Sequence, residues 1–187
     1  MPPTQPNSPP VTLDDETALV RAAQLDPRRF EALYERYVGP VYRYLYSRVG
    51  AVQEAEDLTA QTFLKALEAL PGYHHRGHFA AWLFAIARNK AIDFYRRRRR
   101  QDPLGEDARS EEPDPLAQAV QSDLVARLDG LLRGLKEDER ELVRLRYTAG
   151  LSFAELAALT GRKEAAVKKA LYRLLDRLQA GLEADHE

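Results

Sequence analysis

The sequence contains no cysteine among its 187 residues. This absence excludes disulfide frameworks, thiolate nucleophiles and zinc sites built from cysteine. No stretch approaches the roughly 20 apolar residues that a membrane-spanning helix requires. The opening residues MPPTQPNSPP lack both the basic and the apolar region of a signal peptide. We therefore expect a cytoplasmic protein with no disulfide bond and no membrane segment.

The sequence also lacks the usual marks of an enzyme. It has no glycine-rich loop of the phosphate-binding kind and no serine or histidine arrangement suited to nucleophilic catalysis. His74, His75 and His78 suggest a metal site, but they fall in a loop with no acidic residue beside them, and such sites need further ligands and ordered neighbours. The acids between positions 54 and 57 fit a solvated or partner-facing surface better than a catalytic pair. We predict no catalytic residue, no metal and no cofactor.

The net charge of −1 conceals strong clustering of charge along the chain. Residues 79–100 contain seven basic residues and one acid, and residues 161–178 contain six basic residues and two acids. Between them, residues 101–122 contain six acids and one arginine. Two basic segments on either side of an acidic one indicate two polyanion-binding modules on a tether.

The apolar residues recur at helical spacing, and no strand pattern is present. Five prolines in the first dozen residues predict a disordered tail. Asp26-Pro27 reads as the start of a helix that ends at Gly50, and Gly39-Pro40 is expected to interrupt it. The expected helices of this half span about 14–25, 27–38, 41–49, 53–70 and 79–97.

The second half begins near Pro115 with an apolar stripe of Leu116, Val120, Leu124, Leu128 and Leu131. A short helix is expected over 137–147. Ser152 and Glu155 then form a capping box, and Gly161 fits a tight turn before a last helix whose apolar face contains Val167, Leu171, Leu174, Leu175 and Leu178.

Residues 151–178 therefore form a candidate helix-turn-helix, which could place its second helix in the major groove of DNA. The alternative is two packed surface helices with solvated charges. The run Arg96 to Arg100 could bind phosphates beside rings that stack on unpaired bases, or it could be a solvated helix end. The aromatic residues before it, from Phe79 to Tyr95, are expected mostly in the core.

Three segments resemble the extracytoplasmic-function (ECF) sigma factors of the sigma-70 family. AEDLTAQTFLKAL, residues 55–67, is similar to their polymerase-binding helix, and FAAWLFAIARNKAIDFYRRR, residues 79–98, is similar to their promoter-melting segment. Residues 135–178 are similar to their C-terminal DNA-binding domain. The resemblance implies an all-α fold of two small helical domains joined by a flexible acidic linker. The implied division is a tail 1–13, region 2 over 14–100, a linker 101–114 and region 4 over 115–187.

The resemblance also assigns roles to residues. The helix over 55–67 would dock on the clamp of the largest polymerase subunit through Asp57, Leu58, Gln61 and Phe63. The loop 71–78 would capture an unpaired base of the minus-ten element, and the DNA-binding residues of this half would be Arg88, Asn89, Arg96, Arg97 and Arg98. The last helix would read the minus-35 element through Arg162, Lys163, Glu164, Lys168, Lys169, Tyr172 and Arg173.

Two places depart from the family pattern. Ala60 and Gln61 stand where glutamine and an acid are usual, and Arg162 follows the turn glycine where an apolar residue is usual. Ala165-Ala166 stands where glycine-threonine is common.

The predicted function is that of an alternative sigma factor and not of an enzyme. It would bind core RNA polymerase through the clamp and flap, recognise two promoter elements and help open the duplex. An anti-sigma factor is a further candidate partner. Two other hypotheses remain: a stand-alone helix-turn-helix regulator whose first domain senses a ligand or dimerises, and a metal-dependent nucleic-acid hydrolase that uses His74, His75 and nearby acids.

Overall fold

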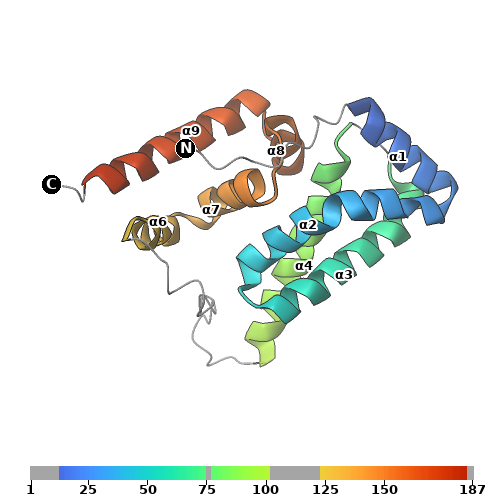
Figure 1. The fold of residues 1–187 in the computed structure, drawn as a ribbon, viewed down its shortest axis with the longest axis horizontal. Coiled ribbons are helices and arrows are strands. Elements are labelled where there is room, and N and C mark those ends of the chain that lie inside the picture. The colour runs from blue at the N-terminus through green and yellow to red at the C-terminus, as the bar shows by residue number, and fades with distance from the viewer. Residues whose placement is uncertain (1–12, 75–76, 102–122, 185–187) are drawn as a thin grey trace.

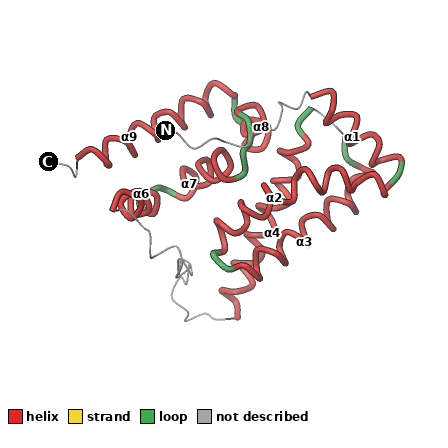
Figure 2. The backbone as a smooth tube through the Cα atoms, viewed as in Figure 1, coloured by secondary structure: helices red, strands yellow, loops and turns green. Residues whose placement is uncertain are grey.

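The computed structural model describes residues 13–74, 77–101 and 123–184 (Figure 1). Within these ranges the regular elements are helices and no strand is present (Figure 2). The described chain forms an N-terminal module, residues 13–101, and a C-terminal module, residues 123–184. This confirms the expected all-α fold of two small helical domains. The predicted tail, most of the linker and the stripe residues Leu116 and Val120 lie outside the described residues.

The N-terminal module consists of α1 (Leu13–Leu25), α2 (Phe30–Val49), α3 (Val52–Ala69) and α4 (Phe79–Gln101). Helices α2, α3 and α4 pack side by side, and α1 crosses one end of them (Figure 1). Their shared core is made of side chains that recur at helical spacing, among them Leu33, Leu45, Leu58, Leu83 and Ala87. The burial of these side chains is what stabilises helices of this length in water.

Helix α2 runs without a break through Pro40, so the expected interruption at Gly39-Pro40 is wrong. A proline inside a helix costs about 3 kcal/mol because it lacks an N–H and its ring crowds the preceding turn. Tyr37, Val41 and Tyr44 lie on both sides of Pro40 and are buried in the same core. Their burial keeps the two halves of the helix on one axis, because a break would remove one half from the core.

Residues next to α2 in the sequence determine where this helix begins and ends. The Asp26 side chain accepts a hydrogen bond from the Arg28 N–H at 3.0 Å, and Pro27 begins a short 3-10 turn, η1 (Pro27–Arg29), that leads into the helix. Gly50 ends the helix with φ of 75°, a left-handed conformation that glycine adopts without steric cost. After α3, a second 3-10 turn, η2 (Leu70–Gly72), leads into the loop before α4.

The C-terminal module consists of α6 (Asp123–Arg133), α7 (Glu137–Val143), α8 (Phe153–Thr160) and α9 (Glu164–Ala184). The helix expected over 137–147 changes at Arg144 into a π-helical turn, η3 (Arg144–Thr148). The predicted capping box is confirmed: Ser152 Oγ accepts from the Glu155 N–H at 3.2 Å, and the Glu155 carboxylate accepts from the Ser152 N–H at 2.7 Å. Gly161, with φ of 66°, makes the expected turn between α8 and α9.

The two modules pack against each other. Helix α8 lies on α4, and η3 lies on α2 (Figure 1). Leu145, Leu156 and Val167 of the C-terminal module join the same core as the side chains of α2 and α4. A small separate cluster of Leu135, Leu174 and Leu178 holds α9 to α7 and α6.

Candidate nucleic-acid interface

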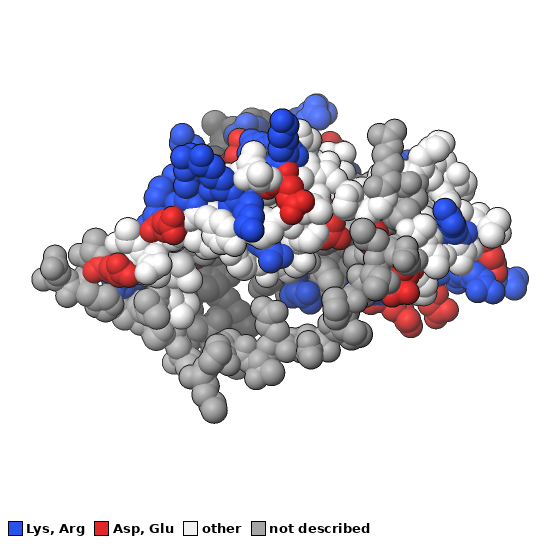
Figure 3. Space-filling model, turned by 90° about the horizontal axis from the view of Figure 1, so that it is seen from above, with Lys and Arg blue, Asp and Glu red and all other residues white. Residues whose placement is uncertain are grey.

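Helix α9 has one buried and one exposed face. Val167, Leu171, Leu174 and Leu178 are buried, as their spacing predicts. The seven residues assigned to promoter reading are all exposed around the start of this helix: Arg162, Lys163, Glu164, Lys168, Lys169, Tyr172 and Arg173. Viewed from above, lysine and arginine side chains gather over this part of the molecule (Figure 3). An exposed basic face on a helix that follows a tight turn has the shape and charge to enter a major groove.

An aromatic cluster lies beside this face. The Lys168 ammonium is 5.8 Å from the ring centroids of both Phe153 and Tyr172, and the Arg146 guanidinium lies 4.9 Å from the centroid of Phe153. Arg146 also donates to the Leu151 carbonyl at 2.8 Å. Cations over ring faces are attracted to them and lose conformational freedom. The sequence did not single out Arg146, because this residue precedes the helix-turn-helix segment. The π-helical turn η3, which contains Arg146, brings its side chain against Phe153.

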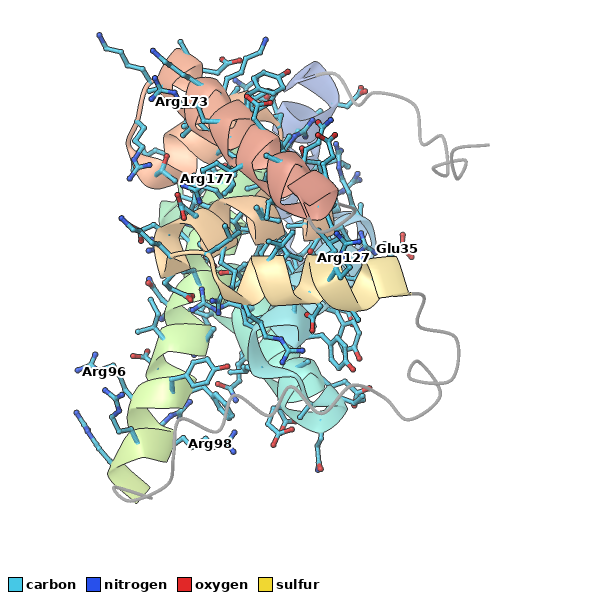
Figure 4. The ribbon with its side chains drawn as sticks, turned by 90° about the vertical axis from the view of Figure 1, so that its left-hand side faces the viewer. Glu35, Arg96, Arg98, Arg127, Arg173 and Arg177 are labelled. Carbon is cyan, nitrogen blue, oxygen red and sulfur yellow. The ribbon has the colours of Figure 1, made fainter. Side chains whose placement is uncertain are left out.

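The basic run at the end of α4 is exposed. Arg96 and Arg98 project from the last turns of this helix (Figure 4). Arg96 pairs with Asp93 at 3.8 Å, and Arg97 donates to the Asp93 carbonyl at 3.3 Å. These contacts are local to the last turns of α4 and leave the side chains exposed to solvent. They lie far from Arg173 on α9 in this view (Figure 4), so the two predicted DNA-binding groups do not form one surface.

The loop before α4 is held by α1. The Gln24 amide donates to the carbonyls of Leu70 at 3.0 Å and Tyr73 at 2.7 Å. The buried Glu16 carboxylate accepts from the Phe79 N–H at 2.9 Å. These contacts fix both ends of the loop predicted to capture a base, and nothing in the sequence pattern of α1 had indicated them.

Aromatic side chains pack together where this loop meets the first turns of α4. Tyr73 and Trp82 have centroids 4.5 Å apart, and Phe79 packs against both. Trp82 is partly exposed, whereas Phe79 is buried. His74 lies in the same loop, its ring Nδ1 3.0 Å from the Gly72 carbonyl oxygen, and His75 lies outside the described residues. No group of three acids or histidines that could hold a metal occurs in the described ranges.

Arg88 and Asn89, the other two residues assigned to DNA, lie on α4 with exposed side chains. The Arg88 side chain is 44% exposed, and its Nε is 3.7 Å from the Glu141 carboxylate of the C-terminal module. Glu141 also accepts a hydrogen bond from the Tyr44 phenol at 2.6 Å. Burial, and then the charge of Glu141, raise the pKa of Tyr44, so the phenol remains a donor at neutral pH.

The four residues assigned to polymerase docking divide into two kinds. Asp57 is exposed and Gln61 is partly exposed on the outer side of α3, whereas Leu58 and Phe63 are 1% and 5% exposed. The Phe63 ring contacts Phe30 and Tyr34. These two side chains therefore hold α3 in the core. Leu64 is 60% exposed on α3, an apolar surface residue that the sequence assignment had left out.

No helix in the described part of the chain has the length and apolar character needed to cross a membrane.

Comparison with known proteins identifies the family. The family model described as Sigma-70 region 2 matches residues 33–101, and the one described as Sigma-70, region 4 matches residues 126–178. The chain is 40% identical over 161 residues to the ECF RNA polymerase sigma factor BldN of Streptomyces coelicolor. This match covers 83% of this chain and 61% of the relative's length. The chain is also 32% identical over 184 residues to the ECF RNA polymerase sigma factor SigD of Mycobacterium tuberculosis. This second match covers 92% of this chain and 87% of the relative's length.

A solved structure has a similar fold. The sigma factor RpoE from Bartonella quintana, in complex with the anti-sigma factor NepR, has a TM-score of 0.61 and 27% identity, over 83% of this chain and 98% of that chain. The matched ranges contain the outer face of α3, the whole of α4 and the helix-turn-helix of α8 and α9. The chain therefore belongs to the ECF sigma factors of the sigma-70 family, alternative sigma factors that direct RNA polymerase to promoters.

Proposed function

We propose that the two modules divide transcription initiation between them, with α9 reading the upstream promoter element and α3 and α4 holding polymerase and melted DNA. The observation that carries this proposal is the exposed basic face of α9 opposite its buried leucine stripe. A helix fixed by its buried face presents the other face at a constant angle, as base reading requires.

Position along α9 divides its residues by role. Lys163 and Glu164 lie at the start of the helix, where side chains reach base edges, and they specify sequence. Lys169, Tyr172 and Arg173 lie further along and contribute affinity through phosphate contacts. A good base contact gives roughly 1–3 kcal/mol of discrimination.

The polymerase-docking surface in this proposal is the outer face of α3. Asp57 and Gln61 make the polar contacts with the clamp, and Leu58 and Phe63 keep the helix in position from within the core. The exposed Leu64 side chain adds apolar area to the same face. An exposed apolar residue beside charged ones is typical of a surface that a partner covers.

The melted strand in this proposal follows α4. Arg96, Arg97 and Arg98 bind phosphates, and Arg88 and Asn89, exposed further along α4 from the loop that takes the unpaired base, contact the DNA next to it. The rings of Tyr73 and Trp82, held close together, offer a surface for stacking. Trapping unstacked bases offsets an unstacking cost of a few kcal/mol, so the protein opens DNA without covalent chemistry of its own.

The structural neighbour RpoE was solved with an anti-sigma factor, and we propose that an anti-sigma factor also binds this chain. Its site of action is the cytoplasm, where the polymerase is. The functional domains are residues 14–100 and 115–187, joined by the acidic linker 101–114.

A selection of minus-35 sequences tests the assignment of α9. Wild type, Glu164→Ala and Arg173→Ala, each bound to core polymerase, are used to select from a pool randomised at the upstream element. Glu164→Ala should change the selected sequence, and Arg173→Ala should keep the sequence and weaken binding. Gln179→Ala, an exposed position further along the same helix, serves as the control. A changed sequence with Arg173→Ala and an unchanged one with Glu164→Ala would show that the helix faces DNA in another orientation.

A further inference from the structure

Helix α1 ends beside the loop that is proposed to capture a base. Gln24, in the last turn of this helix, is partly buried, and its side-chain nitrogen donates to the carbonyls of Leu70 at 3.0 Å and Tyr73 at 2.7 Å. Both distances are those of ordinary N–H···O hydrogen bonds. Because a carbonyl oxygen can only accept, the nitrogen of this amide and not its oxygen faces the loop. The Gln24 side chain therefore uses both of its N–H groups on one loop.

One amide that binds two carbonyls fixes how they lie relative to each other. The two N–H bonds of a planar amide point in different, fixed directions, so both hydrogen bonds form only when the two carbonyls have one relative arrangement. Leu70 is 1% exposed, and its carbonyl also accepts from the Tyr73 N–H at 3.0 Å. Leu70 is thus the fixed end of this arrangement, and Tyr73 is the end that Gln24 positions.

The backbone of Tyr73 decides where its ring lies. The Tyr73 carbonyl belongs to the peptide group that follows its Cα atom, so a hydrogen bond to this carbonyl restricts the backbone rotation of the residue. The centroid of the Tyr73 ring is 4.5 Å from that of Trp82 and 5.7 Å from that of Phe79. The rings of Tyr73 and Trp82 are the surface on which the proposed function stacks an unpaired base. Gln24 therefore acts on that surface through the loop backbone.

Other residues of α1 hold this helix in place. Val20 and Ala23 are 0% and 2% exposed and pack into the core of the N-terminal module. The end of the helix is fixed locally, because the Asp26 N–H donates to the Ala22 carbonyl at 3.0 Å. Gln24 thus extends from a fixed helix to the loop, and loss of its amide should change the loop more than the helix.

We propose that Gln24 is a positioning residue for base capture, whose two hydrogen bonds set the loop shape that decides which base of the minus-ten element is preferred. This inference rests on the proposed function and adds a residue that determines specificity by acting through the loop. When the hydrogen bonds are absent, a base that fits the loop must first restore its shape, whereas a base that fits poorly gains nothing from that shape. Loss of the Gln24 amide therefore lowers the preference between bases.

A selection with holoenzyme tests this role. The pool is a promoter that the wild type uses, randomised across the minus-ten element, and the readout is the base preference at each position in the open complexes. Gln24→Met keeps a side chain of similar length and removes both donors. Gln24→Lys restores donors, because an ammonium group can donate to two carbonyls. Val20→Ala is the control, since it removes buried apolar contacts of the same helix and leaves the hydrogen bonds of Gln24 in place.

The expected result is a change of base preference in one variant. The preference at the captured position should fall about fivefold in Gln24→Met, the factor that corresponds to about 1 kcal/mol, the contribution of one neutral hydrogen bond. Gln24→Lys should keep the preference. Val20→Ala should also keep it, although this variant should unfold at a lower urea concentration. A preference that is unchanged in Gln24→Met, or that is lost equally in either of the other two variants, would overturn the inference.

A second measurement needs no DNA. Trp82 is the only tryptophan of the chain, so tryptophan fluorescence reports on the ring that packs against Tyr73. The acrylamide quenching constant of Trp82 should rise in Gln24→Met and stay at the wild-type value in Gln24→Lys. Equal quenching in all three proteins would refute the effect of Gln24 on the loop. Failure of the proposed function would be seen separately, as a wild-type holoenzyme with no base preference in the minus-ten element even where the fluorescence of the variants differs.

Discussion

Glu16→Ala removes the acceptor that joins α1, α2 and the start of α4. Glu16 is 5% exposed, and its carboxylate accepts hydrogen bonds from the Tyr37 phenol and from the Phe79 N–H. Burial, and then the hydrogen bond with Glu16 and its charge, raise the pKa of Tyr37, so this phenol is a donor at neutral pH. The substitution leaves both donors in the interior without their acceptor.

The magnitude follows from the cost of an unsatisfied buried group. Each such donor costs about 1–3 kcal/mol, so two should lower the free energy of unfolding by about 2–6 kcal/mol. With a urea slope of about 2 kcal/mol per M for a small protein, the lower limit moves the unfolding midpoint by about 1 M. Glu16→Gln should cost less, because its amide oxygen still accepts one hydrogen bond.

Urea unfolding followed by circular dichroism measures this difference. Glu35→Ala is the matched control, because Glu35 is exposed in the first third of α2 (Figure 4) and should shift the midpoint little. If Glu16→Ala and Glu35→Ala unfold at the same urea concentration, the buried carboxylate does not hold the start of α4, and the account of the loop is wrong.

Two further predictions concern the N-terminal module. Asp57→Lys should weaken retention by core polymerase in a pull-down and leave the circular dichroism spectrum unchanged, because Asp57 is exposed on α3; retention equal to wild type would refute the docking assignment. Replacing Arg96 and Arg97 with alanine should weaken DNA binding by holoenzyme similarly on different promoters. It should also lower the salt slope by roughly one unit for each lost phosphate contact, and a changed sequence preference with an unaltered slope would contradict this role.

Local signals were the part of the fold that the sequence could predict. The Ser152 and Glu155 capping box and the turn at Gly161 depend on neighbouring residues, and both are present as predicted. The predicted interruption at Gly39-Pro40 is wrong because it rests only on the local preference of proline. Residues before and after Pro40 are buried in the same core, and their burial keeps the helix continuous. Tertiary packing decides such cases.

Contacts across long separations could not be predicted in this way. Arg48 and Glu141 are 93 residues apart in sequence, and no periodicity in either segment indicates that they meet. The contacts of Gln24 with the loop before α4 are of the same kind. Phe63 was assigned to a partner surface by resemblance, but its burial follows from packing against α2, which only the assembled helices reveal.

Run-off transcription with purified core polymerase on a library of genomic fragments tests the central claim most directly. Core polymerase alone should give nonspecific transcripts, and addition of this protein should give discrete start sites that share an upstream pair of sequence elements. Those start sites should disappear when the C-terminal module is removed at residue 101, because α9 is then missing. Transcripts that are unchanged by the protein, or start sites that persist without α9, would contradict the account.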